Sequence, residues 1–436
     1  MTHRLTSRLR IVGLVGLLMG VALVPVRLWA QPAEVAGKIV YGPHDWPWWR
    51  GPQRDGTADP TQRPPVKWSD TENVAWHTAI PGRGHGSPIV VGDQVFLAIA
   101  DLEQQQQSLL CLDRRTGQQV WSTVVHSGGL ETKGNAKSTL ASTTPACDGE
   151  RVYVNFLNRG AVHTSAVSRQ GKLLWQRHIT DFVVHQGFGA SPALYESLVI
   201  VSADNKGTGA VAALDRLTGQ LVWQNSRPSV PNYTSPIILT IGGRDQLLLT
   251  GCDLVTSLEP RTGKTIWEIA GATTECVTST VTDGQHVYSS GGYPRNHLAA
   301  IRADGSGKIA WENSARVYVP SLLIREGHLY GVLDAGVAMC WKADTGAEVW
   351  KGRLGGTFSA SPVLVGETIY ATNEAGQTFL FAARPDGFQL LGQNQLGDEA
   401  FATPTICGGR IYTRVARQMA GQRQEFVYCL ETSRTP

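Results

Sequence analysis

Short apolar runs and polar turns alternate along most of the chain, and the stretch from Ser87 to Trp121 is representative. Ser87 and Pro88 open an apolar run, and Gly92-Asp93 follows as a tight turn. Pro is tolerated there because the first residue of a strand need not donate to the ladder. The strands that this pattern predicts are 87–91, 94–99, 108–112 and a fourth that begins at 118–121. Together they form a four-stranded antiparallel unit.

This unit repeats along the chain and is marked by two landmarks. The first is a Ser or Thr that opens the apolar run, found at Ser87, Thr144, Ser191, Ser235, Ser279, Ser321, Ser361 and Thr403. The second is a Gly four residues before a Trp, found in Gly117–Trp121, Gly171–Trp175, Gly219–Trp223, Gly263–Trp267, Gly307–Trp311 and Gly346–Trp350. A repeat of roughly 40 to 55 residues is typical of four-stranded units arranged around an axis.

The two ends of the repeated region complement each other. The last unit stops at residues 428–432 without a fourth strand, whereas residues 72–80 resemble a fourth strand with no third before it. Joining them closes the ring and removes the exposed sheet edges. The sequence therefore predicts an all-β fold, an eight-bladed β-propeller of four-stranded antiparallel blades, closed by an N-terminal strand that completes the last blade.

A Trp near the start of most fourth strands is expected to fill the wedge between neighbouring blades. These blade-docking residues are Trp76, Trp121, Trp175, Trp223, Trp267, Trp311 and Trp350. A cofactor-stacking role is disfavoured, because the Trp recurs in nearly every unit whereas a binding site occurs once.

The sequence predicts three segments in the chain. Residues 1–30 combine a basic start, an uncharged apolar run at 11–26 and a small residue, Ala30, which is the pattern of a signal peptide. That run is shorter than the ~20 residues that span a bilayer, so no permanent membrane anchor is expected. Residues 31–66 are a Trp-rich lead-in expected to pack on the propeller, formed by 67–436. The protein is thus predicted to be exported, to the periplasm or outside the cell.

Composition and motifs exclude several functions. The net charge of +3, with 17% charged residues, is too small for nucleic-acid binding. The seven Cys form no CxxC or Cys/His spacing, so no metal site is expected, and their pairing stays open. Three of them, Cys111, Cys340 and Cys429, occupy equivalent places in three units. No catalytic motif is identified, and no catalytic residue is assigned.

The repeats carry a family resemblance. The segment 214–223, LDRLTGQLVW, is similar to the ideal repeat of the quinoprotein-type (PQQ-binding-like) β-propeller superfamily, and 46–56 resembles the lead-in of an exported bacterial group within it. The resemblance covers about residues 67–433. It implies the propeller fold. The superfamily holds dehydrogenases that use the quinone and, more distantly, BamB-like lipoproteins that bind partner proteins without it.

The enzyme branch implies a vicinal Cys–Cys disulfide, a Trp beneath the quinone and a Ca²⁺ held by Glu, Asn and Asp. No two Cys are adjacent here. Glu275 and Asn232 are conceivable oxygen ligands, but no Asp completes the set. No cofactor is therefore expected, and a PQQ-dependent oxidoreductase is kept as an alternative.

Residues just before the first strand of each blade are expected to surround the mouth of the central channel. Those proposed to bind a ligand are Arg83, His85, Lys137, His185, Phe188, Asn232, Tyr233, Glu275, Arg316, Tyr318, Phe358 and Glu399. Unlike the strand positions they do not repeat, and they combine charges with aromatic faces. Such a mouth suits a small polar or glycan-like ligand, although a solvated funnel without a ligand is equally compatible with the sequence.

Three functions remain open on this sequence. The preferred one is an exported, monomeric, non-catalytic binding or scaffold protein whose partner is a small molecule, glycan or protein. The alternatives are a quinone-dependent oxidoreductase and an outer-membrane assembly factor of the BamB type.

Overall fold

The computed structural model describes residues 1–2, 36–131 and 134–433. Ala36–Pro436 forms one compact unit, to which the following description applies. The predicted signal peptide lies outside the described residues. No helix within these ranges is long and apolar enough to cross a membrane.

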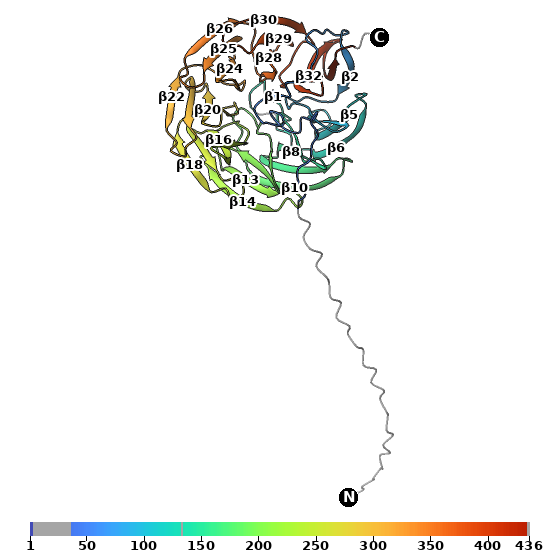
Figure 1. Ribbon diagram of the computed structural model, residues 1–436. Helices are drawn as coiled ribbons and strands as arrows, with labels where there is room; N and C mark the ends of the chain where they lie inside the picture. Colours follow the sequence, from blue (N-terminus) through green and yellow to red (C-terminus); the bar gives the residue numbers. More distant parts are fainter. Residues whose placement is uncertain (3–35, 132–133, 434–436) are drawn as a thin grey trace. The chain divides into compact units, whose positions relative to one another are not determined.

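The compact unit is an all-β propeller of eight four-stranded antiparallel blades arranged in a ring (Figure 1). This confirms the predicted fold class. In every blade the first strand lies nearest the central channel and the fourth lies at the outer rim. Each blade is a meander in which neighbouring strands in sequence pair with one another, so the connections are short and the chain winds once around the axis.

The first four blades are as follows. Blade 1 contains β3(Ile89–Val91), β4(Gln94–Asp101), β5(Gln106–Asp113) and β6(Gln119–Ser127); blade 2 contains β7(Ala146–Cys147), β8(Arg151–Asn158), β9(Ala161–Ser168) and β10(Leu173–Asp181). Blade 3 contains β11(Ala193–Tyr195), β12(Leu198–Ala203), β13(Gly209–Asp215) and β14(Leu221–Arg227); blade 4 contains β15(Ile237–Ile241), β16(Arg244–Gly251), β17(Leu254–Leu258) and β18(Thr265–Ala270).

The last four blades complete the ring. Blade 5 contains β19(Val281–Thr282), β20(His286–Gly291), β21(His297–Arg302) and β22(Ile309–Asn313); blade 6 contains β23(Leu323–Arg325), β24(His328–Val332), β25(Val337–Lys342) and β26(Glu348–Arg353). Blade 7 contains β27(Val363–Val365), β28(Thr368–Thr372), β29(Gln377–Ala382) and β30(Leu390–Gln395); blade 8 contains β31(Thr405–Cys407), β32(Arg410–Met419), β33(Gln422–Glu431) and β2(Val74–Ile80).

Blade 8 is closed by the N-terminal strand, as predicted. Strand β2 pairs antiparallel with β33, with Trp76 opposite Cys429 and Thr78 opposite Val427. In Figure 1 this blue strand lies beside the red strands of the same blade. The pairing joins segments more than 340 residues apart in sequence and leaves no gap in the ring.

The Ser and Thr residues that open the blades form an inner belt of hydrogen bonds. The backbone N–H of each opener donates to the hydroxyl of the next opener, at 2.9–3.0 Å, in Ser87–Thr144, Thr144–Ser191, Ser191–Ser235, Ser279–Ser321, Ser321–Ser361 and Ser361–Thr403. These groups are buried, so each bond satisfies an amide that water does not reach. At these six junctions the hydroxyl of the opener ties its blade to the blade before it.

The Trp residues of the fourth strands form an outer belt. The indole Nε1 donates to a backbone carbonyl in the next blade for Trp76, Trp121, Trp175, Trp223, Trp311 and Trp350, whereas that of Trp267 donates to Gln246 of its own blade. The Gly of the next Gly–Trp turn lies against the indole. At Gly219 an added Cβ would lie 2.7 Å from the ring of Trp175, so the turn needs Gly for space as well as for its φ of +68°.

All seven Cys are buried free thiols. Cys111, Cys340 and Cys429 lie in the third strands of blades 1, 6 and 8, where they pack in the apolar cores between blades. Burial raises the pKa of each of these three thiols to about 12, which makes them unreactive small hydrophobes.

The lead-in runs inside the ring (Figure 1). Its backbone pairs with the first strands of blades 1 and 2 through Trp46–Val90 and Pro47–Cys147. The buried Arg50 donates to the carbonyls of Leu322 and Pro362, which belong to blades 6 and 7. Strand β1(Thr57–Ala58) then pairs parallel with β27 of blade 7. The lead-in therefore crosses the channel and contacts first strands on both sides of it.

The outer belt gives a testable expectation for two glycines with the same backbone conformation. Gly219→Ala should lower the free energy of unfolding by about 2 kcal/mol more than Gly327→Ala, because only the first meets a neighbouring indole. Gly327 has a φ of +71° and no atom within 4 Å of an added Cβ, so it controls for backbone strain. The measurement is urea-induced unfolding followed by fluorescence; equal midpoints for the two variants would contradict the contact.

Candidate functional site

A cavity of about 440 Å³ lies at the mouth of the channel, within the 300–1,000 Å³ typical of small-molecule sites. Each of the eight blades contributes the residue two positions before its opener: His85, Ser142, Gly189, Tyr233, Val277, Val319, Ser359 and Phe401. The openers Thr144, Ser191, Ser235, Ser361 and Thr403 lie below them and also line the cavity. The repeat thus places one side chain of each blade around the axis.

The cavity is open at one end and closed at the other. The mouth residues precede the first strands, whereas the lead-in pairs with residues within those strands, such as Val90 and Leu364. The lead-in therefore lies further along the channel and forms its floor. Trp49 belongs to this floor: it lines the cavity, and its Nε1 donates to the Oγ of Ser279 at 2.8 Å.

Five of the twelve proposed site residues line this cavity: His85, Lys137, Phe188, Tyr233 and Tyr318. His185 lies beside the lining segment 186–189 and pairs through Nε2 with Oε1 of the buried Glu275, at 3.2 Å. Arg316 lies over the ring of Tyr318, 5.8 Å from its centroid. These residues form one region around the mouth.

The other four proposed site residues lie outside this cavity or make contacts that stabilise the propeller. Arg83 lines a separate cavity of about 200 Å³. Asn232 is buried and donates to Asp204 and to the carbonyl of Thr250. Phe358 is 1% exposed and packs on Phe379, and Glu399 pairs with Arg423 at 2.8 Å.

Sequence reasoning missed Trp49 and Phe401 as cavity residues. Trp49 comes from the lead-in, which carries no repeat and whose path across the channel is not encoded locally. Phe401 had a usable signal, because it lies two residues before Thr403, as His85 does before Ser87. The two rings stack across the seam between blades 8 and 1, 4.3 Å apart and 18° from parallel.

Two buried polar atoms of the lining, His85 Nε2 and the Tyr233 hydroxyl, make no hydrogen bond of good geometry to the described residues, although Glu275 and the backbone of Gln186 lie near the phenol. Burial, reinforced by Arg83, Arg414 and Arg423, holds the pKa of His85 well below 6.5, so the imidazole is neutral at pH 7. Burial also raises the pKa of Tyr233, with a further contribution from Glu275. A neutral imidazole and a phenol are thus left with unused hydrogen-bonding capacity, which costs free energy unless a ligand or water supplies a partner.

The residues do not fit the calcium-bound quinone that the enzyme branch implies. Asn232 already binds protein groups through both its oxygen and its nitrogen, and Glu275 pairs with His185. Within the described ranges, no group of three or more His, Cys, Asp or Glu side chains is placed to hold a metal ion. The Cys residues offer no vicinal disulfide.

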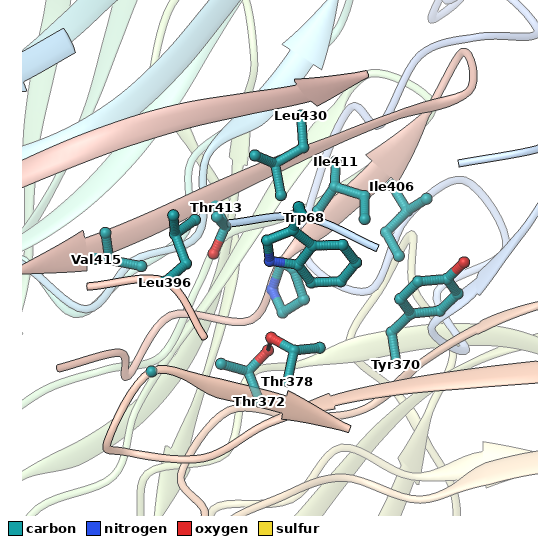
Figure 2. Close-up of a pocket in the computed structure, with 12 residues that line it drawn as sticks. Trp68, Tyr370, Thr372, Thr378, Leu396, Ile406, Ile411, Thr413, Val415 and Leu430 are labelled. Atoms are coloured by element: carbon teal, nitrogen blue, oxygen red, sulfur yellow. Dashed lines mark hydrogen bonds between the residues drawn. The ribbon is translucent and has the colours of Figure 1, made fainter. Parts of the chain in front are cut away.

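A second, much smaller pocket lies between blades 7 and 8 (Figure 2). Figure 2 shows Trp68 at its centre, between Tyr370 and Thr378 of blade 7 and Ile411 and Leu430 of blade 8. Its volume of about 10 Å³ is no more than a single water needs. It is a packing gap, and the mouth cavity is the better candidate for a ligand.

Comparisons with known proteins agree with the repeat. A model of the family described as "Outer membrane protein assembly factor BamB" matches residues 65–182, 105–352 and 295–390. The outer membrane protein assembly factor BamB of Burkholderia pseudomallei is 26% identical over 349 residues, which are 76% of this chain and 81% of that protein. The tetrathionate hydrolase of Acidithiobacillus ferrooxidans is 22% identical over 317 residues, 69% of this chain and 51% of that protein.

Among solved structures, a europium-containing methanol dehydrogenase superimposes with a TM-score of 0.65 at 11% identity, over 89% of this chain and 98% of that one. At this identity the likeness shows a shared fold. The family model, by contrast, covers more than half of the sequence. The chain therefore belongs to the PQQ-like β-propeller family described as outer membrane protein assembly factor BamB.

Proposed function

We propose that the protein is an exported, non-catalytic binding protein that holds a small polar ligand at the mouth of its channel. The observation that carries this proposal is the mouth cavity itself: it has an aromatic floor, a single open end and two buried polar atoms without partners. A cavity with aromatic walls and a few convergent polar groups is typical of a small-molecule site. The lining contributes hydroxyls, amides and a neutral imidazole, which suit recognition by hydrogen bonding.

The proposal predicts that Tyr233→Phe weakens ligand binding about tenfold, or about 1.4 kcal/mol, without changing the melting temperature, because it removes only the unpartnered hydroxyl. His85→Ala and Lys137→Ala should weaken binding as well. The probes are a panel of monosaccharides, disaccharides, amino acids and dicarboxylates, first screened by thermal shift and then titrated by tryptophan fluorescence.

The matched control is Tyr195→Phe, whose hydroxyl bonds Asp245 away from the channel. It should bind the panel as the parent does. The cavity is not the binding site if no compound binds the parent protein. The same conclusion follows if a compound binds all three mouth variants with the affinity that it has for the parent.

A second candidate function is assembly of outer-membrane proteins, favoured by the family match and by the B. pseudomallei relative. In this case the propeller would bind a partner protein. Affinity purification of the tagged protein from its native membranes should then recover outer-membrane assembly components. An unrelated exported propeller, purified in the same way, serves as the control. If the protein recovers no more of these components than the control does, this candidate function is excluded.

The assembly-factor family is also consistent with export. We expect the mature chain to begin near Gln31, because the apolar run at 11–26 is short and is followed by a small residue. Intact-mass measurement of the protein from its native host tests this directly. A full-length, membrane-retained product would contradict it.

A further inference from the structure

We infer that the ligand of the mouth cavity is an uncharged saccharide of one or two rings. This inference rests on the proposed binding function and narrows it to one chemical class. Three features of the lining carry it: the cation that lines the cavity is paired with a carboxylate, the remaining polar groups are neutral, and the walls combine aromatic faces with hydroxyls.

The cations at the mouth are matched by carboxylates. Lys137 Nζ lies 2.7 Å from Glu374 Oε2, which joins the segment before blade 2 to blade 7, and Ser359 Oγ donates to the other oxygen of the same carboxylate at 2.6 Å. Arg316 Nε lies 4.0 Å from Asp334. His185 Nε2 lies 3.2 Å from Oε1 of Glu275, so this imidazole also faces a carboxyl group.

Two of the three arginines near His85 are paired as well. Arg414 contacts Glu425 at 2.6 Å, and Arg423 bridges Glu425 and Glu399 at 2.8 Å to each. The third, Arg83, has no ion pair among the described residues, and it lines the neighbouring cavity of about 200 Å³ and not the mouth cavity. His85 itself is neutral, and its Nε2 is buried without a partner. Among the described residues that line the cavity, the cation Lys137 is paired, so a carboxylate or phosphate that entered would lose hydration without meeting an unpaired cation of the lining, which is unfavourable.

The remaining groups match a sugar ring. Trp49, Tyr318 and Phe401 give apolar faces on which the C–H side of a pyranose can pack, and the indole N–H of Trp49 is already bound to Ser279. Around them lie the hydroxyl of Ser138, the side-chain amides of Asn135 and Gln186, which also bond each other at 3.1 Å, and the hydroxyls of the lining openers, which already accept a backbone N–H but can still donate. Hydroxyls and amides both donate and accept, as the hydroxyls of a sugar do.

Tyr233 and His85 complete this set, because each carries one buried polar atom without a partner. The phenol donates or accepts, and the second ring nitrogen of a neutral imidazole does one or the other according to its tautomer. Neutral groups of this kind suit an uncharged polyol, which brings no charge to be desolvated.

The test compares neutral sugars with their uronates, in which a carboxylate replaces the hydroxymethyl group at C6. Methyl glucoside and methyl galactoside are titrated against the corresponding methyl uronosides, with cellobiose and chitobiose as two-ring probes, by tryptophan fluorescence and calorimetry. A neutral sugar should bind, and its uronate should bind at least tenfold more weakly.

Glu374→Gln makes the test sharper. It removes the charge that balances Lys137, so the preference for the neutral sugar should shrink about tenfold while the neutral affinity changes little. The matched control is Glu367→Gln in the same blade, in the turn between β27 and β28, where the carboxylate pairs with Arg384 and Arg325. It should leave the preference unchanged.

The outcomes separate the inference from the proposed function. The saccharide inference is overturned if a uronate, dicarboxylate or amino acid binds more tightly than every neutral sugar. If Tyr233→Phe also weakens the binding of that compound, the mouth remains the binding site. Failure of the whole panel to bind overturns both. Should Glu374→Gln not fold, the comparison in the parent protein still decides the question.

Discussion

The hydrogen bond from the backbone N–H of one blade opener to the hydroxyl of the next determines how the blades meet. It lies at the centre of the ring, where both groups are buried, and an unmade bond there would cost about 1–3 kcal/mol per amide. Ser and Thr supply the acceptor with little bulk, which lets the first strands converge on the axis. At two of the eight junctions, Ser235–Ser279 and Thr403–Ser87, this bond is not formed; the Ser279 hydroxyl accepts from Trp49 of the lead-in instead.

This belt also fixes the geometry of the candidate site. Because six of the eight junctions are held by the same bond and the blades repeat around the axis, the residue two positions before each opener reaches the channel in every blade. The fold thus depends on the opener, and the chemistry of the site depends on the residue two positions before it. The opener must be a small hydroxyl residue, whereas its neighbour is free to vary among His, Tyr, Phe, Ser, Val and Gly. The variation around the ring gives the cavity its chemistry.

The fold was predictable because its determinants repeat. The openers, the Gly–Trp turns and the unpaired strand at 72–80 gave the blade number and the closure, both of which the structure confirms. The candidate site was only partly predictable, since position before a strand does not determine where a side chain points. Arg83, Glu275 and Glu399 each lie four residues before an opener, and their backbones form bridges with the end of the second strand or the residues after it.

The lead-in shows most clearly why local sequence was insufficient. Trp46, Trp48 and Trp49 were recognisable as an aromatic cluster, but their path through the ring depends on contacts with blades that follow hundreds of residues later. Arg50 bonds carbonyls of blades 6 and 7, and Trp49 bonds blade 5, so the floor of the cavity forms only when most of the ring is present. The site is therefore a property of the closed propeller together with its lead-in. An isolated blade carries the repeat and the strand order, but it has neither the floor nor the opposing wall that a ligand needs.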